Sequence, residues 1–308
     1  MLGSERYTDP SPICFTPPRT NAMAGRSVSP ALPSTTTPNT TGICHPRPLR
    51  HQRKDRHVET SPTNAQPGQA TLTDEIASPR PRNLLIWGVA ALAFLTAMGI
   101  SFLLTLPNAW TQPLDDAWRG VMGSSPQDSL PNSPLAMFFQ QFGQPLGSLF
   151  TLIIIPVALM IFGHWRSGLF VMAASFAGPG LVSQLAKNLV DRPRPATDEA
   201  AGLYGPLFTV DHGSFPSGHA VSMGVFVVVI MALIPAAKVG MRRIWLVIGL
   251  LLCAGMIWQR TLINAHWLSD SITGVIGGVG VGLIMWWAFW PLLKKDESRP
   301  WRIGRTAK

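Results

Sequence analysis

The sequence is poor in charged residues and in cysteine. Only 13% of its 308 residues are charged, against roughly 25% in a typical soluble domain. Hydrophobic residues make up 46% of the chain, and the mean hydropathy is +0.21. The three cysteines, Cys14, Cys44 and Cys253, are too few and too scattered for a disulfide framework or a metal cluster. This composition excludes a chain that is disordered throughout and a coiled coil, and indicates that much of the chain lies in lipid.

Residues 1–82 have a different composition from the rest of the chain. They are rich in Pro, Ser, Thr and Arg and show no apolar periodicity. Such a segment cannot bury enough apolar surface to offset its conformational entropy, so we expect a disordered basic cytoplasmic tail. Its basic stretch at 47–56 leaves a contact with nucleic acid or anionic lipid open. A solvated tail is favoured, and no nucleic-acid partner is predicted.

Six apolar runs follow, each close to the length of about 20 residues that spans a bilayer as a helix. They predict an all-α fold, a bundle of six transmembrane helices over residues 83–292, followed by a basic cytoplasmic tail at 293–308. The short alternating strands of a membrane β-barrel are not found. The runs cover residues 84–106, 146–163, 167–187, 217–237, 244–262 and 267–290.

The distribution of Lys and Arg predicts the orientation of these spans. The net charge of +9 is concentrated in the two tails and in the loops that hold Arg166, Lys238, Arg242 and Arg243. All of these fall on one side if there are six spans, and positive loops face the cytoplasm. We therefore expect a multi-pass protein of the cell membrane with both termini cytoplasmic. The stretches 107–145, 188–216 and 260–266 then lie on the extracytoplasmic side.

The extracytoplasmic stretches carry ionisable residues at the predicted helix ends, where such residues are functional candidates by default. A helix that starts after Pro216 offers free backbone N–H groups to an anion, and Gly218 lets the backbone come close. His266 and Asp270 are four residues apart and share a helix face, so the carboxylate can orient the imidazole as a nucleophile. His219 can protonate a leaving oxygen. Three cations suited to a phosphate accompany them: Lys187, Arg194 and Arg260.

These residues form three ordered blocks that resemble the motifs of the type 2 phosphatidic acid phosphatase (PAP2) family. The blocks are Lys187 with Arg194-Pro195, then Pro216-Ser217-Gly218-His219, then Arg260 with His266 and Asp270. Order and spacing agree throughout, and the resemblance spans roughly residues 84–290. One position departs from the pattern, because Gln259 stands where the family has serine. We expect this change to alter hydrogen bonding in the phosphate pocket without loss of activity.

The resemblance implies a metal-independent mechanism without cofactors. His266 attacks phosphorus and forms a phosphohistidine, Asp270 orients His266, and His219 protonates the leaving group. Five residues are implied to hold the phosphate oxygens: Lys187, Arg194, Ser217, Gly218 and Arg260.

The expected function is therefore hydrolysis of a lipid phosphate or pyrophosphate at the outer membrane face. The acyl or prenyl tail can stay in lipid while the phosphate enters the basic pocket. Undecaprenyl diphosphate is the first choice because its head group is released on that face. Phosphatidic acid, diacylglycerol pyrophosphate and phosphatidylglycerol phosphate are the other candidates. Membrane lipids are the expected surroundings, and no obligate protein partner is indicated.

Two other classes of function remain open at this point. Vanadium-dependent haloperoxidases share the same motifs with vanadate in place of phosphate, but they are soluble. A non-catalytic membrane protein that binds or transports lipid phosphates is the second alternative, and the intact set of two histidines and one aspartate argues against it.

Smaller features carry structural predictions. Arg192 is expected to anchor the chain at the membrane interface, with a further phosphate contact as the alternative. His164 and His212 are expected to be structural. The glycines of the last span, between Gly274 and Gly282, are expected to permit close helix packing.

Overall fold

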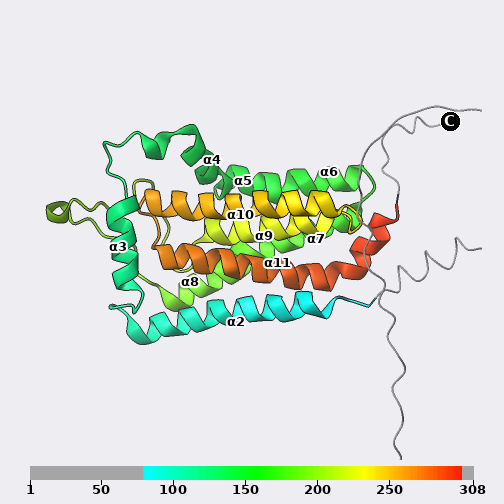
Figure 1. The fold of residues 1–308 in the computed structure, drawn as a ribbon, viewed down its shortest axis with the longest axis horizontal. Coiled ribbons are helices and arrows are strands. Elements are labelled where there is room, and N and C mark those ends of the chain that lie inside the picture. Colours follow the sequence, from blue (N-terminus) through cyan, green and yellow to red (C-terminus); the bar gives the residue numbers. More distant parts are fainter. Residues whose placement is uncertain (1–78, 300–308) are drawn as a thin grey trace, which may run out of the picture. The chain divides into compact units, whose positions relative to one another are not determined.

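The computed structural model describes residues 79–299 of the chain. The predicted tail at 1–82 lies outside the described residues up to residue 78, and the predicted tail at 293–308 lies outside them from residue 300. Within residues 79–299 the regular elements are all helical, as the sequence predicts (Figure 1).

Four helical segments are long and apolar enough to cross a membrane: α2 (Arg82–Thr105), the continuous segment Trp165–Val190, α10 (Val239–Leu262) and α11 (Leu268–Glu297). The 24 residues of α2 extend about 36 Å at 1.5 Å per residue, which exceeds the ~30 Å hydrocarbon layer. The segment Trp165–Val190 consists of α7 (Trp165–Phe176), a π-helical stretch η3 (Ala177–Ser183) and α8 (Gln184–Val190). These segments correspond to the first, third, fifth and sixth predicted spans.

The second predicted span is a bent pair of helices. The helix α4 (Pro134–Phe142) meets the segment Pro145–Ile161 at an angle of 57°. Pro145 lacks the N–H that would continue the preceding helix, so the chain turns between them. The second segment comprises α5 (Pro145–Leu149), a π-helical stretch η2 (Phe150–Ile154) and α6 (Ile155–Ile161). The π-helical stretch ends two residues before Pro156, where the regular ladder of hydrogen bonds cannot continue.

The fourth predicted span is shorter than expected. The helix α9 (Gly218–Leu233) has 16 residues and ends before Pro235, because the residue preceding a proline is pushed out of the helical conformation. By length and composition, four helices of the described residues can cross a membrane, or five if the bent pair counts as one span. A sixth crossing therefore depends on α9 and stays a prediction.

Shorter helices lie in the connecting stretches. The helix α3 (Gln112–Met122), which the sequence analysis did not predict, crosses one end of the bundle near the start of α11 (Figure 1). Two 3₁₀ turns, η1 (Leu130–Asn132) and η4 (Glu199–Ala201), lie in the loops at the same end.

Close packing of α11 against α9 and α2 forms the centre of the bundle. A Cβ atom added to Gly274 would lie 2.8 Å from the Ser217 carbonyl oxygen, and one added to Gly280 would lie 3.0 Å from the Gly88 carbonyl oxygen. Backbones approach this closely only where glycine removes the side chain. The prediction of close packing along the last span is confirmed. The packing also fixes the start of α11 beside the start of α9.

A buried carboxylate joins the helices at the opposite end of the bundle. Asp296 is 1% exposed and accepts hydrogen bonds from the Ser167 backbone N–H at 2.9 Å, the Ser167 hydroxyl at 3.1 Å and Arg166 Nη1 at 3.1 Å. The helix α11 continues past the predicted end of the last span, and this extension places Asp296 against α7.

Replacing Asp296 with alanine removes a buried acceptor from three donors. We expect Asp296→Ala to cost about 2 kcal/mol or more, which lowers the melting temperature of the detergent-solubilised protein by roughly 4–8 °C. Glu297→Ala is the matched control, because Glu297 only pairs with Lys294 at the surface. Equal melting temperatures for the two variants would contradict a stabilising role for the Asp296 contacts.

Candidate active site

The three sequence blocks meet around one cavity of about 630 Å³. The cavity lies beside the start of α9 and the end of α10. Two of the predicted site residues, Ser217 and Asp270, do not line it and lie in the layer behind. Six others are among the lining residues: Lys187, Arg194, Gly218, His219, Arg260 and His266.

A tight turn after α10 brings Arg260 and His266 to the same cavity. Asn264 adopts a left-handed conformation with φ of 54°, which asparagine tolerates better than most residues. The chain reverses there, and the His266 backbone N–H donates to the Arg260 carbonyl at 3.3 Å. The turn thus brings the backbones of Arg260 and His266, which are separated in the sequence, into direct contact.

The imidazole of His266 has one nitrogen fixed and the other directed to the cations. Its Nδ1 lies 2.7 Å from the Ser214 carbonyl oxygen, and its Nε2 lies 3.3 Å from Arg194 Nη1. A carbonyl can only accept, so Nδ1 carries the proton. The lone pair of the imidazole is therefore on Nε2, beside a guanidinium that lines the cavity.

The surroundings of His266 keep it neutral. Burial lowers the pKa of His266 well below its ordinary value of 6.5, and the positive charges of Arg194, Arg260 and Lys187 lower it further. The hydrogen bond to the Ser214 carbonyl acts in the opposite direction but is the smaller effect. At neutral pH the imidazole is therefore an unprotonated base or nucleophile.

Asp270 is connected to His266 through Ser214. The fully buried carboxylate accepts from the Ser214 hydroxyl and from the Trp267 backbone N–H at 3.1 Å. The same Ser214 presents its carbonyl to His266. Ser214 thus lies between the aspartate and the histidine. The prediction that these two residues share a helix face is wrong, because α11 begins at Leu268 and His266 precedes it.

An acidic residue that the sequence analysis did not assign to the site, Asp211, joins two of the phosphate-binding candidates. Its carboxylate lies 2.7 Å from Lys187 Nζ and 2.5 Å from Arg194 Nη2. Burial alone would raise the pKa of Asp211, but the hydrogen bond and charge of Lys187 together with the charge of Arg194 hold it below its usual value. An anion that binds these two cations has to compete with this carboxylate.

Gln140 on α4 organises the opposite wall of the cavity. Its side-chain oxygen accepts from Arg260 Nη2 at 3.0 Å and from Gln259 Nε2 at 3.1 Å, and its backbone oxygen lies 3.2 Å from His219 Nε2. Gln259 therefore contacts a neighbouring helix at the site, at the position where the family has serine. A single glutamine fixes both a cation and the second histidine.

The start of α9 presents Gly218 to the cavity, while Ser217 lies behind the wall. The Ser217 backbone N–H donates to the Asp270 carbonyl at 3.2 Å, and its buried hydroxyl has no hydrogen-bond partner among the described residues. Of the two phosphate contacts predicted for this turn, Gly218 therefore lines the cavity and Ser217 does not.

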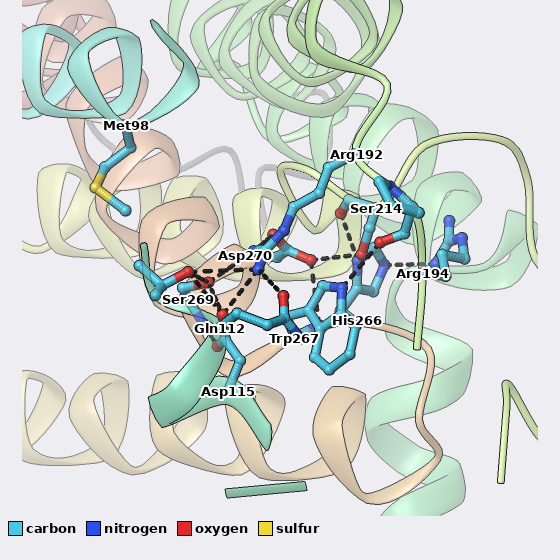
Figure 2. A network of polar contacts seen from close by, with 12 residues as sticks. Met98, Gln112, Asp115, Arg192, Arg194, Ser214, His266, Trp267, Ser269 and Asp270 are labelled. Carbon is cyan, nitrogen blue, oxygen red and sulfur yellow. Dashed lines mark hydrogen bonds and ion pairs between the residues drawn. The ribbon is translucent and has the colours of Figure 1, made fainter. Parts of the chain in front are cut away.

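The prediction for Arg192 is wrong. Its side chain is 1% exposed and lies inside the protein behind His266, where it contacts Asp115 and Asp270 (Figure 2). The prediction failed because the interface rule applies to a long cation at a helix end, whereas two buried carboxylates hold this one. His212 is exposed and lies 3.0 Å from Asn188 Oδ1.

Five residues of the site were not assigned from the sequence: Asp115, Gln140, Arg192, Asp211 and Ser214. Arg192 stands two residues before Arg194, and Gln140 is a polar residue within an apolar run, so both carried a signal. Ser214 acts through its carbonyl, which residue type alone does not reveal. Among residues 79–299, no group of three or more His, Cys, Asp or Glu side chains could hold a metal ion, and metal independence stays a prediction.

Three comparisons relate this chain to known proteins. Residues 168–294 match the PAP2 superfamily. A lipid A 1-phosphatase from Rhizobium johnstonii is 27% identical over 168 residues, which cover 49% of this chain and 61% of that protein. The chain thus matches less than two thirds of this relative's length.

The fold is similar to a solved structure as well. A transmembrane PAP2 type phosphatidylglycerolphosphate phosphatase from Bacillus subtilis aligns with a TM-score of 0.53 and 18% identity, covering 64% of this chain and 93% of that one. The residues that match the family model, 168–294, hold all three sequence blocks. The family match over residues 168–294 covers less than half of this multi-pass membrane protein and supports a PAP2 phosphatase.

Proposed function

We propose that this chain is a membrane phosphatase that hydrolyses a lipid phosphate or diphosphate through a phosphohistidine on His266. The observation that carries the proposal is the position of His266. Its Nδ1 is tied to a carbonyl and its Nε2 faces Arg194 in a cavity that Lys187 and Arg260 also line. A neutral imidazole beside three cations suits attack on an anionic phosphorus centre.

The reaction takes two steps. In the first, the Nε2 lone pair of His266 forms a bond to phosphorus while the bond from phosphorus to the leaving oxygen breaks, and His219 gives that oxygen a proton. In the second, water attacks the phosphohistidine, inorganic phosphate leaves, and His219 takes up the proton released by the water. The cations Lys187, Arg194 and Arg260 balance the charge on the phosphoryl oxygens, with Gly218 at the start of α9 as a backbone contact.

The shape of the cavity supports a lipid substrate. From the cations it reaches Leu152 and Phe176, which belong to the apolar segments Pro145–Ile161 and Trp165–Val190. Phe176 is 54% exposed on the outside of the bundle. A lipid can therefore keep its chain in the bilayer while its phosphate reaches His266.

The distribution of charge supports activity on the extracytoplasmic face. Basic residues gather at the end of the bundle away from the cavity, where α10 begins and α11 ends, and positive ends face the cytoplasm. These residues are Arg80, Arg82, Lys238, Arg242, Arg243, Lys294 and Lys295.

Four substrates deserve direct comparison. Undecaprenyl diphosphate remains the first choice because its head group is released on the proposed face, and phosphatidic acid is the simplest lipid phosphate. The name of one relative adds lipid A carrying a 1-phosphate, and the name of the other contains phosphatidylglycerol phosphate, which the sequence already made a candidate. Release of inorganic phosphate from these four lipids by the full chain in detergent tests the proposal, and halide oxidation in the presence of vanadate tests the haloperoxidase alternative.

Loss of the nucleophile should abolish turnover. We expect His266→Ala to reduce phosphate release by at least roughly 10³-fold and to prevent labelling of the protein by a radioactive lipid phosphate. His212→Ala is the matched control, because His212 is exposed and bonded to Asn188. Turnover by His266→Ala at the rate of the control would rule out the phosphohistidine mechanism.

The pH dependence of kcat/KM should reflect the low pKa of the His266 imidazole. Because burial and three cations lower the pKa of His266, we expect the acidic limb of kcat/KM, corrected for ionisation of the lipid, to lie below pH 6.5. Arg194→Gln removes one positive charge and should move this limb to higher pH, in addition to weakening phosphate binding. A limb above pH 6.5 in the unmodified protein would count against His266 as the titrating nucleophile.

The position of His219 can be tested without replacing it. A Cβ atom at Gly143 would overlap the His219 ring, whereas a Cβ atom at Gly120 meets nothing within 4 Å. We expect Gly143→Ala to lower kcat by roughly 10-fold or more, and Gly120→Ala to leave it unchanged. Equal kcat values for the two variants would show that the position of the His219 ring beside Gly143 does not matter for proton transfer.

A further inference from the structure

A buried group of charges lies directly behind His266, on the side away from the cavity. The guanidinium of Arg192 lies between two carboxylates, with Nη2 at 2.9 Å from Asp115 Oδ2 and Nη1 at 2.7 Å from Asp270 Oδ1 (Figure 2). All three side chains are at most 1% exposed. Two carboxylates and one guanidinium leave this cluster with one net negative charge.

The hydrogen bonds of Asp270 divide between its two oxygens. Arg192 occupies Oδ1, and the Ser214 hydroxyl and the Trp267 backbone N–H occupy Oδ2. Without Arg192, Oδ1 would be buried without its charged partner, and the carboxylate could rotate away from Ser214. The Ser214 backbone N–H donates to the Arg192 carbonyl at 2.7 Å. The Arg192 side chain, acting through Asp270 and the Ser214 hydroxyl, adds a second restraint on Ser214, whose carbonyl fixes His266 Nδ1.

Asp115 holds Arg192 from the other side. Its carboxylate also accepts from the Ser269 backbone N–H at 2.9 Å, the Ser269 hydroxyl at 2.7 Å and the Thr111 hydroxyl at 2.8 Å. These contacts join α3 to the first turn of α11, next to Asp270. The Arg192 guanidinium also lies 4.4 Å above the ring of Phe102, which limits its rotation.

We infer that Arg192 and Asp115 are positioning residues of the phosphatase site: through Asp270 and Ser214 they hold His266 with Nε2 toward the phosphate. This inference rests on the proposed function. A lysine at position 192 cannot replace arginine fully, because the flat guanidinium bonds two carboxylates at once through separate nitrogens. The net negative charge behind His266 also stabilises the positive charge that its ring acquires when Nε2 binds phosphorus.

The charged groups around His266 define what a substitution should do. The groups on the cavity side are Arg194, Arg260, Lys187, His219 and Asp211, which pairs with Lys187 and Arg194. Asp270, Arg192 and Asp115 lie behind. Asp115→Asn keeps the shape of the side chain but removes one negative charge from the rear. With less negative charge behind His266, the protonated imidazole is less stable and its pKa is lower. The acidic limb of activity should therefore move to lower pH.

The test uses the full chain in detergent with phosphatidic acid as the probe, and His266→Ala in the same assay as the reference for the proposed function. We expect Asp115→Asn to lower kcat by roughly 10-fold or more, to change KM by less than about twofold, and to shift the acidic limb of kcat downward. Asp116→Asn, one residue along the same helix and exposed, should behave like the unmodified protein. Arg192→Lys should retain more kcat than Arg192→Gln.

Each outcome distinguishes a positioning role of Asp115 and Arg192 from a purely structural role. A drop in kcat with KM preserved and the limb shifted supports the inference. An unchanged kcat and pH profile in Asp115→Asn overturns it, as does a loss confined to melting temperature or shared equally by kcat and KM without a shift of the limb. If Arg192 variants do not fold, Asp115→Asn alone gives the answer. Activity in His266→Ala would instead contradict the proposed function itself.

Discussion

The hydrogen bond from His266 Nδ1 to the Ser214 carbonyl is the contact on which the rest of the site depends. An imidazole has two nitrogens, and fixing the proton on one determines which nitrogen can attack. Here the bond of 2.7 Å places the lone pair on Nε2, beside Arg194. The cations of the cavity and the buried charges behind Ser214 act on the reaction through this one orientation.

The bundle makes this arrangement possible by bringing three helix ends together. The tight contact of α11 with α9, which glycine at position 274 allows, places Asp270 next to the start of α9. The turn at Asn264 brings His266 back to Arg260. Because these ends lie at one end of apolar helices, a phosphate can be bound by cations while its lipid chain stays outside the bundle.

Much of the fold and of the cavity wall could be predicted from the sequence because both follow from residue type and spacing. Apolar runs of span length gave helices at five of the six places with small shifts, and α9 is shortened by Pro235. The residues of the three blocks that reach the cavity include both histidines and three cations. Spacing in a chain identifies such residues well when each acts through its own side chain.

The parts that the sequence did not reveal depend on contacts between distant segments. Ser214 acts through its backbone oxygen, and any residue type has one. Gln140 comes from a bent helix whose angle is not encoded in a short pattern. Arg192 has the same residue type as an interface anchor, and only its burial between Asp115 and Asp270 distinguishes the two roles.

The most direct test of this account is a structure of the full chain with orthovanadate, which mimics the phosphoryl group in the transition state of phosphoryl transfer. The account predicts a bond from vanadium to Nε2 of His266, vanadate oxygens within hydrogen-bond distance of Arg194 and Arg260, and the Nδ1 bond to Ser214 intact. Vanadium bound to Nδ1, to His219 or outside this cavity would contradict it.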